Sequence, residues 1–393
     1  MRRRPGLIAD YRQDVAIFRT NVQRFWFVIA LVAVVLLGLG VTLPIIPGFV
    51  SFGLKGDLLI IGITAMFAAV GAIGLNLVTG YAGQVSLGHA FFIGVGAFTA
   101  AALGGAPKLV GSGDLIAHQL DMAIWLPAAG LVAAALGLIV SPIAFRLKGL
   151  YLAFVTIGLL FVGGLIFREW TSLTGGVGLG REAAVPRLFG WQIDQNGEVL
   201  GVFLSGDQRL FLFAFVVLLA MAFAAKNLAR SKIGRAWSAV RDRDIAAEMM
   251  GINLSRYKAI AFVISSFYAG VAGALLYTVV GRLEPGVFSD APGFVLSVRF
   301  VAMILIGGVA TISGSIMGAF FISFLPRIVK WMAGFAIFGF ISESPAGGFV
   351  TLSQFEAILF GLLIVGFLIF EPLGLYGIWL RVRNYWKAWP FSY

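Results

Sequence analysis

Five polar side chains without a fixed charge lie in a stretch that is otherwise apolar and rich in glycine. The stretch reads "GLNLVTGYAGQVSLGHAFFIGVGAF" and runs from Gly74 to Phe98. Amide, hydroxyl and imidazole groups donate and accept hydrogen bonds, so their chemistry is that of binding a polar solute. A weak echo of this pattern occurs later, in "GGVATISGSIMGAF". The predicted solute-pathway residues are Asn76, Thr79, Gln84, Ser86, His89 and Ser313.

A break in helical structure is predicted between Tyr81 and Gly88. The break lacks the charge of a short surface loop, and the apolar run that follows it, 89–104, is short for a full membrane span. Both features indicate a break recessed in the membrane, which lipid tolerates only where protein or water surrounds it. A half-helix that begins near Gly88 would point free N–H groups and its positive dipole end along a pore, where a carboxylate could use them.

A second interpretation of the same residues is a tightly packed helix corner. Gln84 and Ser86 would then cap helix ends and would contact no solute. For His89 taken alone, a hydrogen-bonded packing role is the simpler interpretation. The sequence leaves both alternatives open.

Several other classes of protein are disfavoured by what the chain lacks. It has two widely separated histidines, no cysteine, and neither a G-x-S-x-G nor an H-E-x-x-H motif, which makes an enzyme or a metal site improbable. The G-x-x-x-x-G-K-[ST] motif of an ATPase is also missing, and nothing resembles a nucleic-acid-binding motif. An ion-coupled carrier usually keeps acids or bases inside its spans. Here Arg299 and Glu356 lie near predicted outer ends, where their charges could reach the interface.

The elements that position these residues are predicted to be membrane-spanning helices. The chain has 393 residues, of which 60% are hydrophobic and 12% charged, against roughly 25% charged in a soluble domain. Continuous apolar runs, rather than alternating ones, predict an all-α polytopic membrane protein with about ten spans. We expect one transmembrane domain over 25–380, an N-terminal segment 1–24 and a tail 381–393. The predicted spans are 25–43, 58–80, 89–104, 123–145, 150–167, 209–225, 259–280, 293–311, 314–333 and 354–375.

The distribution of basic residues predicts the orientation. The net charge is +11, and most of the 29 Lys and Arg residues fall in segments on one side if both termini share that side. Cytoplasmic loops carry such an excess, so both termini and the segment 226–258 are predicted to be cytoplasmic. The segment 168–209 is predicted to be external and loop-like, with short structured pieces.

One amphipathic helix is predicted in the cytoplasmic segment, from Gly234 to Gly251. Apolar residues share one face, whereas Arg241 and Asp244 are spaced to pair on another. Gly251 suits a left-handed cap, and Asn253 or Ser255 can cap the next helix. A solvated loop is the alternative, but a stripe of alanines suits close approach by a partner protein. The predicted partner-contacting residues are Arg241, Asp244, Ala246, Ala247, Glu248 and Gly251.

The segments "AVRDRDIAAEMMGI" and "YKAIAFVISSFYAGVAGALL" resemble the permease signature of ABC importers. Together with "GLNLVTGYAGQVSLGHAFF", "LTGGVGL" and "FEPLGLYGIW", they resemble the LivM-type permease of branched-chain amino-acid importers, over roughly residues 58–380. Asp244 stands where that family has a glutamate, which keeps the charge. In "LTGGVGLG" the sequence permits either a turn-rich surface loop or a contact with an external binding protein.

The resemblance implies a type II ABC-importer-like permease with a cytoplasmic coupling helix in the bacterial inner membrane. Its implied partners are a second, LivH-type permease, two ATP-binding cassette ATPases and a soluble substrate-binding protein. No cofactor is expected on this chain, since ATP and Mg²⁺ would bind to the ATPases. The implied function is transport of branched-chain or related hydrophobic amino acids by alternating access. Importers of urea, short amides or aromatic acids use related permeases and are the alternative.

Overall fold

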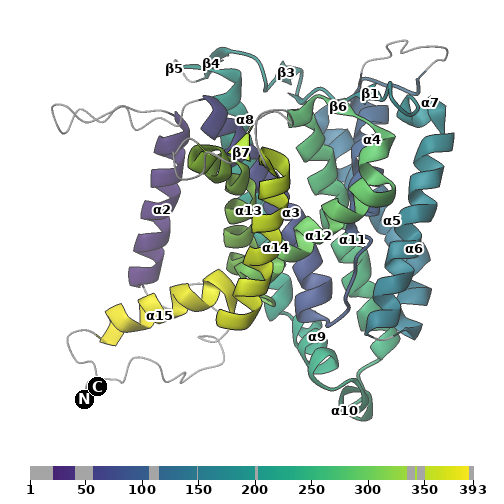
Figure 1. The fold of residues 1–393 in the computed structure, drawn as a ribbon, viewed down its shortest axis with the longest axis vertical. Helices are drawn as coiled ribbons and strands as arrows, with labels where there is room; N and C mark the ends of the chain where they lie inside the picture. The colour runs from purple at the N-terminus through teal and green to yellow at the C-terminus, as the bar shows by residue number, and fades with distance from the viewer. Residues whose placement is uncertain are drawn as a thin grey trace.

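The computed structural model describes residues 21–39, 56–105, 115–147, 149–199, 202–333, 341–342 and 350–388. Helices dominate these ranges (Figure 1). The helices are α2 (Asn21–Leu39), α3 (Gly56–Asn76), the π-helix η1 (Leu77–Tyr81), α4 (His89–Gly104), α5 (Met122–Arg146), α6 (Leu150–Glu169), α7 (Thr171–Thr174), α8 (Gly206–Arg230), α9 (Lys232–Asp242), α10 (Asp244–Met249), α11 (Leu254–Val280), the 3-10 helix η2 (Pro285–Phe288), α12 (Asp290–Gly307), α13 (Ile312–Ala333), α14 (Leu352–Phe370) and α15 (Gly374–Ala388).

The all-α polytopic membrane fold is confirmed. Within the described residues, seven helices are long and apolar enough to cross a membrane, and α14 with α15 forms an eighth, bent by 49°. Two shorter apolar helices, Arg24–Leu39 and His89–Gly104, account for the remaining predicted spans. Helices satisfy their own backbone hydrogen bonds, which the hydrocarbon core requires. The predicted count of about ten is therefore roughly consistent with the structure.

The helices α3 and α11 form the centre of the bundle. Within their most apolar windows, 78% of α3 and 67% of α11 is buried, against 28–44% in the other long spans. Glycines bring α11 against α4: a Cβ at Gly96 would collide with the carbonyl oxygen of Gly270, and one at Gly273 with that of Ile93. Such small residues permit the close backbone approach on which packing in lipid depends.

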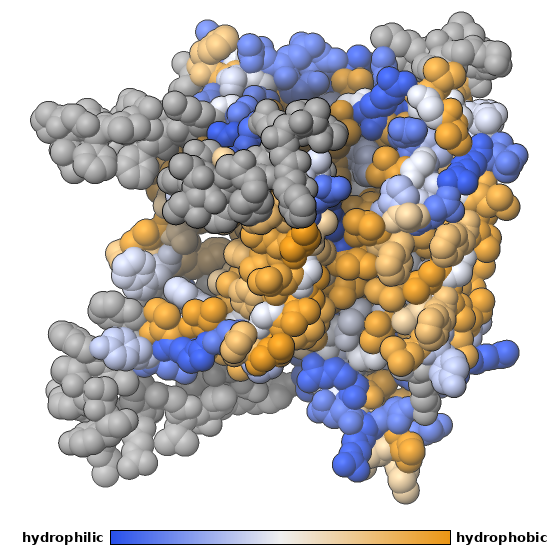
Figure 2. Space-filling view, viewed as in Figure 1, coloured by the Kyte–Doolittle hydropathy of each residue, from blue (hydrophilic) through white to orange (hydrophobic). Residues whose placement is uncertain are grey.

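The outer faces of the bundle are apolar. On α6, Tyr151, Phe154, Phe161 and Leu165 are all exposed. Figure 2 shows hydrophobic residues over the middle of the molecule and hydrophilic residues toward both ends. This banding is what a helix bundle surrounded by lipid requires, because lipid chains solvate apolar side chains as well as a protein core does.

Short strands cover the end of the bundle at the top of Figure 1. They are β1 (Arg181–Glu182), β2 (Arg187–Leu188), β3 (Trp191–Gln192), β4 (Gly197–Val199), β5 (Val202–Leu204), β6 (Arg282–Leu283), β7 (Ile341–Ser342) and β8 (Val350–Thr351). The pairs β1–β6, β2–β3 and β4–β5 are antiparallel, and β7–β8 is parallel. The segment 168–209 is thus a loop with short structured pieces, as predicted from its turn residues.

A single buried arginine connects three parts of this end. Arg181 is 2% exposed, and its guanidinium donates to the carbonyl oxygens of Leu173 (2.6 Å), Ala101 (2.7 Å) and Ile116 (3.0 Å). Burial lowers the pKa of Arg181 to about 10, so the group is still a cation at neutral pH. Carbonyls that end a helix, such as that of Ala101 in α4, carry partial negative charge and favour a cation.

The opposite end of the bundle carries the most charged segment, and there one prediction is wrong. The residues 234–251 do not form one helix: Arg243 is extended (φ −155°, ψ 104°) and separates α9 from α10. The apolar face of α9 packs on the bundle, with Trp237 buried and its indole N–H donating to the Tyr257 carbonyl (2.9 Å). This contact fixes the direction of α9, and the chain must turn before α10 can extend outward.

The predicted caps around this turn are confirmed. Gly251 has φ +83°, a left-handed conformation that suits glycine. Asn253 caps α11, and its Oδ1 accepts from the N–H of Arg256 at 3.0 Å. Capping residues act through the local backbone, so short-range sequence is sufficient to predict them.

Candidate substrate pathway and coupling site

The predicted break follows a π-helical turn. The N–H of Ala82 donates to the Leu77 carbonyl (3.2 Å), and that of Gln84 to the Val78 carbonyl (2.9 Å). After Tyr81 the backbone is irregular until α4 begins at His89. π-Helical turns are rare in proteins, and those that occur are often found at functional sites. The chain therefore breaks where the polar and glycine residues predicted it.

Asn76 holds this break against the turn between α12 and α13. Its Nδ2 donates to the carbonyl oxygen of Thr311 (2.9 Å) and to Ser315 Oγ (2.7 Å), and its Oδ1 accepts from the N–H of Ala310 (2.8 Å). The side chain is 1% exposed, so these bonds satisfy a buried amide. A Cβ at Gly80 would collide with the same Asn76 oxygen, which explains the glycine. The two glycine-rich stretches of the sequence thus lie in contact.

N–H groups just before and at the start of α4 have partners inside the protein. The N–H of Ala90 donates to Ser297 Oγ (3.0 Å), and that of Leu87 to Thr156 Oγ1 (2.9 Å). His89 is 2% exposed, and its Nε2 lies 3.1 Å from the Gly71 carbonyl oxygen. These N–H groups at the start of α4 therefore already donate hydrogen bonds to side chains of the protein.

The remaining pathway candidates differ in their surroundings. Thr79 is half-buried and donates to the carbonyl of Gln84 (3.1 Å), Ser86 is buried, and Ser313 is exposed in the first turn of α13. The side-chain amide of Gln84 is buried, and neither its oxygen nor its nitrogen has a hydrogen-bond partner. Neither Gln84 nor Ser86 caps a helix end. A buried amide without partners is costly, so the side chain of Gln84 has unused capacity for hydrogen bonding.

The break directly contacts helix α9. Arg241 Nη1 donates to the Gly80 carbonyl oxygen at 2.8 Å, and a Cβ at Gly83 (φ +69°) would lie 2.8 Å from Arg241 Cγ. A cavity of about 200 Å³ lies at this contact, lined by Gln84, Arg241 and Lys258 among others. The predicted solute-pathway residues and the predicted partner-contacting residues, which are far apart in the sequence, therefore meet at this contact.

The short helix α10 is the outermost part of this end (Figure 1). Ala246 and Glu248 are exposed on it, and Gly251 follows it, whereas Ala247 is only 4% exposed. Arg241 forms an ion pair with its neighbour Asp242 (Nε–Oδ1 3.5 Å). Asp244 begins α10, where its Oδ1 accepts from the N–H of Ile245 (2.9 Å).

Sequence reasoning missed the largest exposed apolar side chains of this helix. Ile245, Met249 and Met250 are 69%, 85% and 83% exposed. We call these three residues the α10 tip. Figure 2 shows hydrophobic residues at the lower extremity of the molecule, next to a hydrophilic surface. Exposed apolar residues beside a charged surface are typical of interaction sites. Ile245 and Met249 are four residues apart, and this spacing in the sequence could have indicated that they share one face of a helix.

Among the residues that the structure describes, no group of three or more His, Asp or Glu side chains is arranged to hold a metal ion. The polar groups at the break are amides, hydroxyls, carbonyls and the imidazole of His89, all of which can form hydrogen bonds.

Known proteins share this sequence pattern. A family model described as "Branched-chain amino acid transport system / permease component" matches residues 58–368. The permease protein LivM of the high-affinity branched-chain amino acid transport system of Salmonella typhimurium is 30% identical over 279 residues, which is 67% of this chain and 61% of the relative. LivM of Escherichia coli has the same identity and coverage. LivH of Salmonella typhimurium is 24% identical over 317 residues, which is 78% of this chain and 90% of the relative. No solved structure matches.

Proposed function

The chain belongs to the family of branched-chain amino acid transport system permease components, and from this we propose that it is one membrane-spanning subunit of an ATP-driven importer. Its cargo in this proposal is branched-chain or related hydrophobic amino acids. The aligned region spans only 61% of the LivM relatives, so substrate and partners belong to the proposal. Membership of the permease family rests on the family model, which matches residues 58–368 and so covers most of the chain.

One contact carries the proposal: Arg241 of α9 donates to the backbone of the pathway break at Gly80. Energy must enter from outside, because the sequence has no P-loop of its own. The α10 tip offers an apolar surface for a partner ATPase, and α9 links that surface to η1. Movement of a docked ATPase would therefore displace the break directly. This is the arrangement that alternating access requires.

The proposed assembly has four further components: a LivH-type permease, two ATPases that bind ATP and Mg²⁺, and a soluble binding protein. We expect the purified assembly, reconstituted in vesicles with ATP, to accumulate leucine, isoleucine and valine. Uptake should require ATP and should not respond to an imposed proton or sodium gradient. Urea, a short amide and benzoate are the comparison solutes. Uptake of one of these in place of leucine would contradict the amino-acid proposal, and gradient-driven uptake without ATP would contradict the importer class.

The proposed orientation places both termini, α9 and α10 in the cytoplasm of a bacterium, and the β-strand end outside. The chain contains no cysteine, so single introduced cysteines report cleanly. We expect Ser172→Cys, an exposed position in α7, to react with a membrane-impermeant thiol reagent in intact cells. Ser231→Cys, at the start of α9, should react only after the membrane is permeabilised. The reverse pattern would invert the topology.

A further inference from the structure

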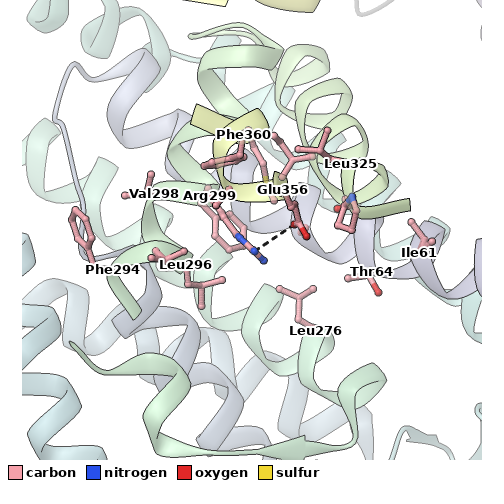
Figure 3. Close-up of a pocket in the computed structure, with 18 of the residues that line it drawn as sticks. Ile61, Thr64, Leu276, Phe294, Leu296, Val298, Arg299, Leu325, Glu356 and Phe360 are labelled. Carbon is pink, nitrogen blue, oxygen red and sulfur yellow. Dashed lines mark ion pairs between the residues drawn. The ribbon is translucent and has the colours of Figure 1, made fainter. Parts of the chain in front are cut away.

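A cavity of about 610 Å³ lies between α3, α11, α12, α13 and α14 (Figure 3). Its size falls within the range of about 300–1,000 Å³ typical of small-molecule sites. The lining is mostly aliphatic and aromatic, including Ile61, Leu276, Leu296, Leu325 and Phe360. The cavity lies in the half of the bundle nearest the short strands, because its lining residues on α14 come from the N-terminal half of that helix, which follows β8. Nothing in the pathway described above uses it.

Two opposite charges face each other in this apolar lining. Arg299 of α12 and Glu356 of α14 form an ion pair across the cavity, with Nη2 and Oε1 3.6 Å apart (Figure 3). That separation is longer than the roughly 2.7–2.9 Å of a direct charge-assisted hydrogen bond. Both residues line the cavity, and their side chains are 52% and 23% exposed. Ionisable residues within membrane spans are rare and mark substrate pathways.

We propose that this cavity binds an apolar α-amino acid in its zwitterionic form. The carboxylate binds Arg299, whose planar guanidinium suits carboxylate geometry, and the ammonium group binds Glu356. The aliphatic side chain of the solute packs on the apolar lining. In the empty cavity the two charges neutralise each other, and a zwitterion that inserts between them leaves the net charge of the site unchanged. The inference rests on the proposed function and deepens it by naming which chemical groups of the cargo are recognised.

The charge pair discriminates between the solute classes that related permeases transport. Urea and short amides carry no charge for either residue. An aromatic acid supplies a carboxylate but leaves Glu356 without an ammonium partner, and an unpartnered charge in an apolar site is strongly unfavourable. Only a solute with an ammonium and a carboxylate group on the same carbon atom satisfies both side chains. A site built in this way selects α-amino acids before it selects among their side chains.

The cavity also adjoins the pathway break through one aromatic ring. Phe300, next to Arg299, lines the cavity and is 1% exposed. The centre of its ring lies 5.1 Å from that of His89, the first residue of α4. A Cβ at Gly71 would lie 2.7 Å from Phe300 Cε1, so the ring is held tightly from a third side. Phe300 thus lines the cavity and also contacts the first residue of α4.

A protection experiment tests the site. Ser323 lines the cavity on α13, and Ser323→Cys introduces the only thiol in the chain. In the purified assembly, without ATP, we expect millimolar L-leucine to slow thiol labelling about tenfold. The probes 4-methylpentanoate, which lacks the ammonium group, and 3-methylbutylamine, which lacks the carboxylate, should protect at least tenfold less well. Adding Arg299→Gln or Glu356→Gln should weaken protection by leucine by about tenfold or more, since each leaves one charge of the pair without its partner.

Arg327→Gln is the matched control. Arg327 pairs with Asp57 at 3.8 Å, also between two spanning helices, but neither residue lines the cavity. This variant should keep full protection, and Arg299→Lys, which retains the charge, should keep part of it. Labelling that leucine does not change, or a thiol that never reacts because a neighbouring chain fills the cavity, overturns the site. If ATP-driven leucine uptake persists in that case, the proposed function stands while the binding site is refuted. Protection without any uptake supports the site and refutes the importer.

Discussion

Replacing Gly96 by valine is expected to leave little folded permease in the membrane. A Cβ at this position would collide with the carbonyl oxygen and the Cα of Gly270 on the neighbouring helix α11. Backbone atoms cannot move aside as a flexible side chain can, so α4 and α11 must separate. Overpacking a well-packed interior costs about 1–3 kcal/mol even where side chains can adjust, and here we expect several kcal/mol. The measurement is the fraction of detergent-solubilised protein that remains monodisperse after heating.

Gly158→Val is the control for this prediction. Gly158 lies on α6, and a Cβ there would have no atom within 4 Å. The change in helix propensity is the same for both substitutions, so a difference between them reports packing alone. We expect the Gly158 variant to melt within a few degrees of the parent. Equal thermal stability of both variants would show that α4 and α11 do not pack as the structure has them.

The second large effect is expected at the α10 tip. Replacing Met249 and Met250 together by aspartate should abolish the stable association of a partner ATPase. Both side chains are more than four-fifths exposed, and aspartate there would have to be desolvated in an apolar interface. Interface hot spots contribute at least about 2 kcal/mol each, so the dissociation constant should rise more than about 30-fold. The measurement is ATPase binding to the permease in nanodiscs.

Two further variants distinguish a loss of ATPase binding from misfolding of the permease and from a failure to transmit ATPase movement to the break. Lys232→Asp adds an acidic side chain at an exposed position of α9 and should bind the ATPase normally. Arg241→Gln should also bind it but should reduce uptake, because the contact with the Gly80 carbonyl is weakened. Ala247→Trp would be less informative, since Ala247 is buried within this chain and a larger side chain would disturb folding first. Normal ATPase binding by the double Met variant would rule out the α10 tip as the docking surface.

The sequence predicts those features that depend on local or periodic information. Continuous apolar runs identify the spans, because the membrane imposes the same requirement on every helix that crosses it. Gly251 and Asn253 are predictable for a similar reason, since each acts on the backbone within a few residues of itself. The irregular segment between Tyr81 and Gly88 likewise follows from glycine and polar residues adjacent in the chain.

Features that depend on packing between distant helices are not predictable in this way. The division of α9 from α10 at Arg243 follows from the burial of Trp237 against α11, which no local pattern encodes. Arg299 and Glu356 belong to separate helices, and the sequence gives no reason to pair them. The partners of Asn76 lie more than 230 residues further along the chain. Candidate residues can thus be named from the sequence, while their contacts require the fold.

Arg181 has a thermodynamic consequence for the end of the bundle that the short strands cover. One guanidinium serves the carbonyls of Leu173, Ala101 and Ile116, and it is buried at the point where they converge. If any one of these segments detaches, the same charge remains buried with fewer acceptors, so each departure makes the next one easier. The three segments therefore stabilise one another and order as a single cooperative unit. Hydrogen exchange of their amides should accordingly show one common opening free energy in place of three.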